Sequence, residues 1–167
     1  MDIQKELVAE FDREVATTRK VLAAIPADVD LGWKPHEKSM RLGILAGHLC
    51  ELAGNWGMSA LTTDKLEMIS GQKYEPYIPA DTTALLAYFD EQTAKVKDVL
   101  AKIPLSTWDE NWRFIMSGQV IISESKFSVW RTWVMNHLIH HRGQLGVYLR
   151  LLNTKVPGAY GPSADEM

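Results

Sequence analysis

The longest helical pattern in the chain covers residues 125–152, SKFSVWRTWVMNHLIHHRGQLGVYLRLL. Its apolar side chains recur at intervals of three and four residues, which is the spacing of one face of a helix. The members of this stripe are Val129, Trp130, Trp133, Val134, Leu145, Tyr148 and Leu152. A helix of this length can hide such a stripe from water only against other helices. The stretch therefore favours a helical bundle.

Three earlier segments have the same periodicity, over residues 3–25, 39–56 and 82–103. Pro26 ends the first segment and Pro104 ends the third, because proline cannot continue the hydrogen-bond ladder of a helix. Amphipathic helices of this length cover one another's apolar faces. We therefore expect an all-α fold, a bundle of four helices.

The helix ends and two glycines carry further expectations. Ser39 is a good N-cap for the second helix, and Asp81 or Thr82 for the third, because their side chains can accept a hydrogen bond from the first free N–H groups. Gly54 and Gly57 lie near the end of the second helix. Since glycine weakens a helix and has no side chain, they indicate close packing or fraying there.

Two connections are too long to be simple turns, over residues 26–38 and 104–123. In the second, apolar residues flank Ser117 and Gly118, which predicts a small β-hairpin lying across the bundle, between helices three and four. The stretch 156–163, VPGAYGPS, is rich in turn residues, and we expect it to wrap back over the surface.

The composition is that of an ordinary globular protein. The chain has 167 residues, 46% hydrophobic and 23% charged, which excludes wholesale disorder. This length favours a single domain over residues 1–167. The 18 basic and 21 acidic side chains leave a formal net charge of -3, without a Lys/Arg cluster, and this argues against a nucleic-acid partner.

Three sequence features favour a cytoplasmic location. No apolar run approaches the roughly 20 residues that cross a bilayer, so we expect no membrane association. The first residues, MDIQKE, are charged and lack the apolar core of a signal peptide. The one cysteine, Cys50, excludes an intramolecular disulfide and fits a reducing compartment.

Two histidines on the longest helical pattern are candidate metal ligands. His137 and His141 are one turn apart, at about 40° from each other around the helix axis. They fall on the apolar stripe, so both imidazoles are expected to face the inside of the bundle, where this spacing lets them bind one metal ion. His140 lies about 100° behind His141 and is left out of the site.

A third histidine, His48, occupies an inward position on the second helix, between Leu45 and Leu52. Asn55 lies two turns further on at nearly the same angle, which predicts a polar streak on that face. An imidazole from this helix that meets the pair would complete a three-histidine metal site. The alternative is that the histidines pair with polar groups of the core and bind no metal.

Other readings of these residues fit less well. A zinc-protease helix has a glutamate directly after its first histidine, and His137 is followed by Leu138. A di-iron carboxylate bundle needs several glutamate ligands, including Glu-x-x-His pairs, and the sequence has none. Cys50 faces nearly opposite His48, so we interpret it as a buried structural thiol.

The stretches 136–150, NHLIHHRGQLGVYLR, and 156–165, VPGAYGPSAD, resemble the C-terminal signature of the DinB/YfiT-like family. The segments WKPHEKS at 33–39 and GHL at 47–49 also match that family's pattern. The resemblance covers essentially the whole chain. It implies an up-down-down-up four-helix bundle, a homodimer, and a divalent metal ion held by three histidines.

Carried over by position, those metal ligands are His48, His137 and His141. Zinc and nickel are the expected ions, with iron or manganese as alternatives, because imidazole discriminates poorly among them. Three neutral nitrogen ligands leave open positions on the ion, as in catalytic centres. Family members with an assigned activity resemble transferases or isomerases that activate a low-molecular-weight thiol on the metal. A metal-activated hydrolase fits the ligands equally well.

The resemblance also leaves open a non-catalytic, stress-responsive bundle whose metal is structural or sensory. Gln144 belongs to the matching motif and falls on the metal-facing side, where we expect it to orient a ligand or a bound water as a candidate catalytic residue. Arg142 points elsewhere and is expected to anchor a loop or the carboxylates of the tail. Substrate specificity is expected to come from the connections 26–38 and 104–123.

Overall fold

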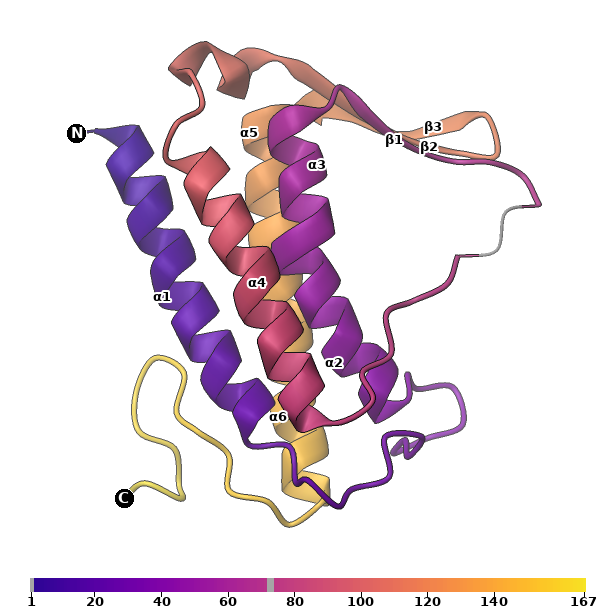
Figure 1. Cartoon of the computed structure of the whole chain (residues 1–167), viewed down its shortest axis with the longest axis vertical. Helices are drawn as coiled ribbons and strands as arrows, with labels where there is room; N and C mark the ends of the chain where they lie inside the picture. The colour runs from indigo at the N-terminus through magenta and orange to yellow at the C-terminus, as the bar shows by residue number, and fades with distance from the viewer. Residues whose placement is uncertain (1, 72–73) are drawn as a thin grey trace.

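The computed structural model describes residues 2–71 and 74–167, and most of them are helical. Four long helices lie side by side, with a small sheet at one end (Figure 1). The elements in chain order are α1 (Ile3–Ala23), α2 (Leu42–Glu51), η1 (Leu52–Trp56), α3 (Gly57–Thr62), β1 (Lys65–Met68), α4 (Thr82–Leu100), η2 (Leu105–Asp109), β2 (Asn111–Met116), β3 (Gln119–Ser125), α5 (Lys126–Val129), η3 (Trp130–Asn136) and α6 (His137–Leu151). The prediction of four helices is confirmed.

Two of the four long helices are composite. In each, a π-helical segment joins two α-helical parts without a break: η1 lies between α2 and α3, and η3 lies between α5 and α6. A π-turn takes more residues than an α-turn, so it shifts the angular positions of all residues that follow. Asn55 lies inside η1, and it is exposed. The predicted polar streak inward from His48 to Asn55 is therefore wrong.

The N-terminus of α2 differs from the prediction as well. The N-cap residue is Arg41, and no side chain caps the helix. Instead, the backbone N–H of Leu42 donates to the carbonyl of Trp33 at 2.8 Å, and that of Gly43 donates to the carbonyl of Leu31 at 2.8 Å. The preceding loop thus satisfies the first N–H groups, so Ser39 is not needed as a cap. At α4 the predicted cap is confirmed, because Asp81 accepts from the N–H of Ala84 at 2.8 Å.

The two glycines of the second long helix mark close packing, as one of the two sequence readings proposed. A Cβ atom at Gly54 would lie 2.7 Å from Cβ of Gln92, and one at Gly57 would lie 3.2 Å from a methyl group of Val96. Both neighbours belong to α4. The segment η1–α3 therefore packs against α4 at a distance that only a residue without a side chain allows at Gly54.

The predicted hairpin is confirmed as β2 and β3, which pair antiparallel. Ser117 and Gly118 connect them with φ values of 51° and 78°. Positive φ at both central residues matches the twist of the strands in a two-residue turn. The sequence analysis missed β1, which pairs parallel with β2 and completes a three-stranded sheet.

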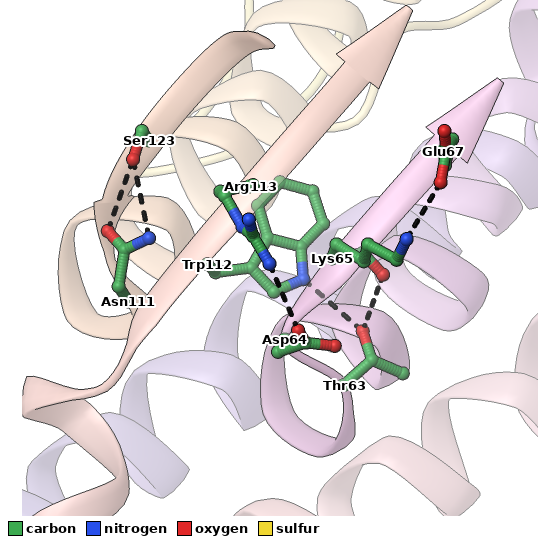
Figure 2. Close-up of polar contacts among 8 residues, drawn as sticks. All are labelled: Thr63, Asp64, Lys65, Glu67, Asn111, Trp112, Arg113 and Ser123. Carbon is green, nitrogen blue, oxygen red and sulfur yellow. Dashed lines mark hydrogen bonds and ion pairs between the residues drawn. The ribbon is translucent and has the colours of Figure 1, made fainter. Parts of the chain in front are cut away.

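Side chains tie this sheet to the end of α3 (Figure 2). The indole N–H of Trp112 donates to the Thr63 hydroxyl at 3.3 Å, and Arg113 donates to Asp64 at 3.2 Å. Trp112 is fully buried, so the hairpin covers the end of the bundle.

The core has two clusters of buried side chains. One lies around the sheet and contains Phe11, Trp108, Trp112 and Trp130. The other joins α1, α2, α4 and α6 and consists mainly of leucines. No helix of the described residues is long and apolar enough to cross a membrane.

Candidate metal centre

The fold brings His48, His137 and His141 together. His48 lies in the second half of α2, whereas His137 and His141 occupy the first two turns of α6. Each offers one ring nitrogen, and these atoms all lie within 4.8 Å of one another. Nε2 of His141 is 2.8 Å from Nε2 of His137. The three residues selected by helical spacing thus form a group whose nitrogens could hold a metal ion.

Two of these imidazoles are held in the neutral form that a metal requires. Burial, together with the nearby His141 and His48, lowers the pKa of His137 to about 4. Burial also lowers the pKa of His141, despite the opposite effect of its hydrogen bond to Gln144. At neutral pH, both residues therefore have a nitrogen lone pair to offer.

The spacing of the nitrogens fits one ion. A tetrahedral ion with bonds of about 2.0–2.1 Å places its ligand atoms about 3.3 Å apart. The observed separations, from 2.8 Å between the Nε2 atoms up to 4.8 Å, lie on both sides of this value. Small side-chain rotations would equalise them. Two imidazole nitrogens at 2.8 Å also need a proton or a cation between them, because their lone pairs would otherwise repel.

Nδ1 of His137 gives a second reason to expect a cation at the three histidines. It is buried and makes no hydrogen bond of good geometry to the described residues, although the Trp133 backbone is near enough to raise the pKa of the ring slightly. If the proton sits between the two Nε2 atoms, this Nδ1 is left as an unpaired buried acceptor, which is costly. A cation at Nε2 would move that proton to Nδ1 and towards the Trp133 backbone.

Gln144 contacts a histidine of the cluster. Nδ1–H of His141 donates to Oε1 of Gln144 at 2.7 Å, and the amide Nε2 of Gln144 donates to His140 at 3.0 Å. This bond places the proton of His141 on Nδ1 and frees Nε2. Gln144 and His140 are both exposed, and His140 stays outside the cluster as the helix geometry predicted.

The sequence analysis missed Glu51, which is buried beside His48. Oε2 of Glu51 lies 3.5 Å from Nδ1 of His48. The carboxylate also accepts hydrogen bonds from the Tyr74 hydroxyl and, at 3.0 Å, from the Tyr77 N–H. Burial raises the pKa of Glu51, but the nearby His48 and the hydrogen bonds from Tyr74 and Tyr77 outweigh it and leave this pKa below its usual value. Glu51 is the only acidic residue of α2, and this was a usable signal.

A cavity of about 470 Å³ adjoins the cluster through Glu51. Its walls combine apolar side chains with carboxylates, and its lining residues are Glu51, Asn55, Trp56, Leu66, Glu67, Met68, Tyr74 and Glu75. None of these residues belongs to the connections 26–38 and 104–123, where the sequence analysis placed specificity. The walls come instead from α2, η1 and β1, and from Tyr74 and Glu75.

Cys50 is a buried thiol, as predicted. Its sulfur faces the backbone carbonyls of Ala46 at 3.5 Å and Leu85 at 3.9 Å. Burial raises the pKa of this thiol well above its usual value, and the charge of Glu51 raises it further. A thiol that resists ionisation is a poor nucleophile.

Arg142 anchors the tail, though not through the tail's carboxylates as expected. It donates to the Tyr160 hydroxyl of the tail at 2.6 Å and pairs with Glu14 of α1 at 2.6 Å. The tail carboxylate of Asp165 pairs instead with Arg150, at 2.7 Å. The tail does wrap back over the bundle (Figure 1).

Comparison with known proteins places this arrangement in a family. The model of the DinB family matches residues 1–167. The chain belongs to the DinB family. The crystal structure of a DinB-like protein from Bacillus cereus ATCC 10987 is similar, with a TM-score of 0.72 and 19% sequence identity over 93% of this chain and 97% of that one. At that identity the likeness shows the fold alone. Among curated proteins, no match is found.

Proposed function

We propose that this DinB-family protein is a metal-dependent enzyme that binds one divalent ion through His48, His137 and His141. The observation that carries the proposal is the convergence of three ring nitrogens, from two separate helices, within 4.8 Å. When bound, such an ion lowers the pKa of a water or thiol at its open position towards neutrality and so supplies a nucleophile. The activity proposed is a thiol-dependent transfer or a hydrolysis.

The residues around the histidines suit this role. The cavity beside Glu51 provides about 470 Å³ for a small molecule, with Trp56, Leu66 and Met68 as apolar walls. Gln144 fixes the proton of His141 away from the cluster. Cys50 does not compete as a nucleophile, because it is buried and its pKa is raised. We therefore assign the thiol of a transfer reaction to a co-substrate rather than to the chain.

A non-catalytic role is the second candidate. His48 lies on α2 and the other two histidines lie on α6, so an ion bound there would also join two helices. In this case the metal stabilises the bundle or reports on metal or redox state to a partner. A coordination sphere with no exchangeable position would favour this candidate over catalysis.

Metal content of protein purified without an affinity tag tests the site. We expect about one zinc or nickel ion per chain in the wild type and in His36→Ala, and much less in His141→Ala. His36 is a matched control because it is an exposed histidine in the loop before α2. Equal metal content in all three proteins would refute the three-histidine site.

The reaction class is tested on cobalt- or nickel-substituted protein. Charge-transfer bands on addition of small thiols would support thiol transfer, whereas turnover of esters or amides without any thiol response would support hydrolysis. If neither occurs and solvent does not exchange at the metal, the structural or sensory role replaces the enzyme.

The helix order and the homodimer are also part of the proposal. The up-down-down-up helix order agrees with the connection from residue 63 to 81, which is long enough to return along the full length of a helix. The homodimer rests on the family resemblance, and light scattering of the purified protein measures it directly.

A further inference from the structure

We propose that Glu51 is a positioning residue for His48: its carboxylate accepts the Nδ1 proton and so aims Nε2 at the metal. The inference rests on the proposed metal-binding function and names a residue that determines how well the site is formed. Neutral imidazole carries its proton on one nitrogen only, so a partner at Nδ1 decides which nitrogen is free to bind.

The two helices of the site repeat the same arrangement. On α6, Gln144 follows His141 by three residues and accepts from its Nδ1 at 2.7 Å. On α2, Glu51 follows His48 by three residues, with Oε2 at 3.5 Å from Nδ1. Residues three apart on a helix face the same side. Each helix therefore supplies both a histidine and an acceptor for that histidine's outer nitrogen.

Glu51 is fixed in place from outside the helix. The Tyr74 hydroxyl and the Tyr77 N–H both donate to its carboxylate, and its side chain is only 8% exposed. A carboxylate held at both oxygens cannot turn away from His48. Its negative charge also favours an imidazole that carries a metal cation, in contrast to the neutral amide of Gln144.

Gly47 makes this contact possible. Any side chain at Gly47 would overlap the backbone carbonyl of Tyr77, so the segment after β1 lies directly on α2 at this point. Tyr77 is held there from the other side by stacking on Tyr88 of α4, with ring centroids 4.1 Å apart. The orientation of His48 therefore depends on a segment that also contributes Tyr74 to the cavity wall.

Three substitutions separate the contact from its charge. Glu51→Met removes both the acceptor and the charge, whereas Glu51→Asp keeps the charge but withdraws the carboxylate by one methylene group. Glu67→Gln is the matched control: Glu67 lines the same cavity but pairs with Lys65 at 2.8 Å. Removal of an outer acceptor lowers metal affinity by about 10- to 100-fold.

We expect this loss of Co²⁺ and Zn²⁺ affinity in both Glu51 variants, measured by competition with a chromophoric chelator. We expect a change of less than about threefold in Glu67→Gln. The melting temperature of each metal-free variant shows that it is folded. Wild-type affinity in the Glu51 variants, or an equal loss in Glu67→Gln, would overturn the role of Glu51.

The tautomer of His48 in the metal-free protein gives a readout that a merely structural role would not move. Two-bond ¹⁵N–¹H correlation spectra should place the proton on Nδ1 in the wild type and show a mixture of the two neutral tautomers in Glu51→Met. A proton on Nε2 in the wild type would overturn the inference. If the wild type takes up no metal, the proposed function fails first, and the positioning role fails with it.

Discussion

His141 and Arg142 are consecutive buried residues of α6, and their side chains have different kinds of partner. Arg142 faces α1, where it pairs with Glu14 at 2.6 Å and donates to the Glu14 carbonyl and to Thr18, and it also donates to Tyr160 of the tail. His141 faces His137, nitrogen to nitrogen at 2.8 Å. The guanidinium donors of Arg142 therefore meet acceptors and a carboxylate, whereas the imidazole nitrogens of His137 and His141 meet each other.

This difference distinguishes a buried residue that stabilises the fold from one that can bind a cation. A buried charge that is fully paired holds the fold together, and removal of one partner leaves the other charge exposed to a low dielectric. A group of buried lone pairs without donors has a free-energy cost that only a cation or a proton offsets. Burial alone therefore does not identify a functional residue, and the set of partners does.

The largest effect is expected for Arg142→Met. It leaves the Glu14 carboxylate, which is 9% exposed, without its cation. We expect a loss of about 3–5 kcal/mol in the free energy of unfolding, measured with urea. The double substitution with Glu14→Leu should recover most of this loss, because no unpaired charge remains. A loss below about 1 kcal/mol in the single variant would contradict the structural role.

Tyr160→Phe probes the same cluster more gently. The Tyr160 hydroxyl accepts from Arg142 at 2.6 Å and donates to Glu14 at 3.0 Å. Hydrogen bonds to charged groups contribute about 1.5–3 kcal/mol when buried. Because Tyr160 is 72% exposed, we expect only about 1–1.5 kcal/mol from urea unfolding. Metal content should stay at the wild-type level, and a decrease would show that the two clusters are coupled.

His137→Leu should act in the opposite direction on the metal-free protein. The substitution removes a buried imidazole whose Nδ1 lacks a hydrogen bond of good geometry. We expect the metal-free variant to be more stable than the metal-free wild type by about 1 kcal/mol, while metal uptake is lost. Differential scanning fluorimetry with and without a chelator measures both. Destabilisation similar to that of Arg142→Met would remove the distinction between the clusters.

The exposed pair of Arg150 and Asp165 gives the smallest effect and a pH dependence. Hydrogen bonds from Arg150 and from the Val156 N–H lower the pKa of Asp165 to about 2. A lowered carboxylate pKa stabilises the folded state above the unfolded value of about 3.9 and loses that effect as the pH falls towards 2. Asp165→Asn should therefore cost a little stability at pH 7, and this cost should shrink as the pH falls from about 4 through 2. A pH-independent difference in urea unfolding would contradict this.

Much of the architecture could be predicted from the sequence. Periodicity located the four helices, although the second continues past the predicted residue 56 to Thr62, and α1 and α4 already end at Ala23 and Leu100, shortly before Pro26 and Pro104. The turn at Ser117 and Gly118 is a local signal, because apolar residues flank the pair and glycine accepts the positive φ that Gly118 adopts. The three histidines could be grouped because each lies on the inward face of its helix, and that face can be identified from the periodicity of a single helix.

The features that were missed depend on contacts between distant segments. The four residues of β1 become a strand only because β2 lies beside them, and that pairing joins Lys65 to Arg113. The start of α2 is satisfied by backbone carbonyls of the preceding loop, which no side-chain pattern encodes. The only sequence signal for Glu51 is that it is an acidic residue at an inward position of α2. Asn55 was misplaced because a constant α-helical angle does not hold across η1.

The two π-helical segments have a consequence for how this protein tolerates insertions and deletions. Removal of one residue from η1 would let α2 and α3 join as a regular α-helix, and the later residues would keep nearly the same angle relative to His48, because the wider turn already accommodates the extra residue. Gly57 would then still meet Val96, whereas the same deletion within α2 after His48 would turn Gly57 by about 100° away from it. In these two helices, the π-helical segments are therefore the places that tolerate loss of a residue best, and the regular turns beside the imidazoles are the places that tolerate it least.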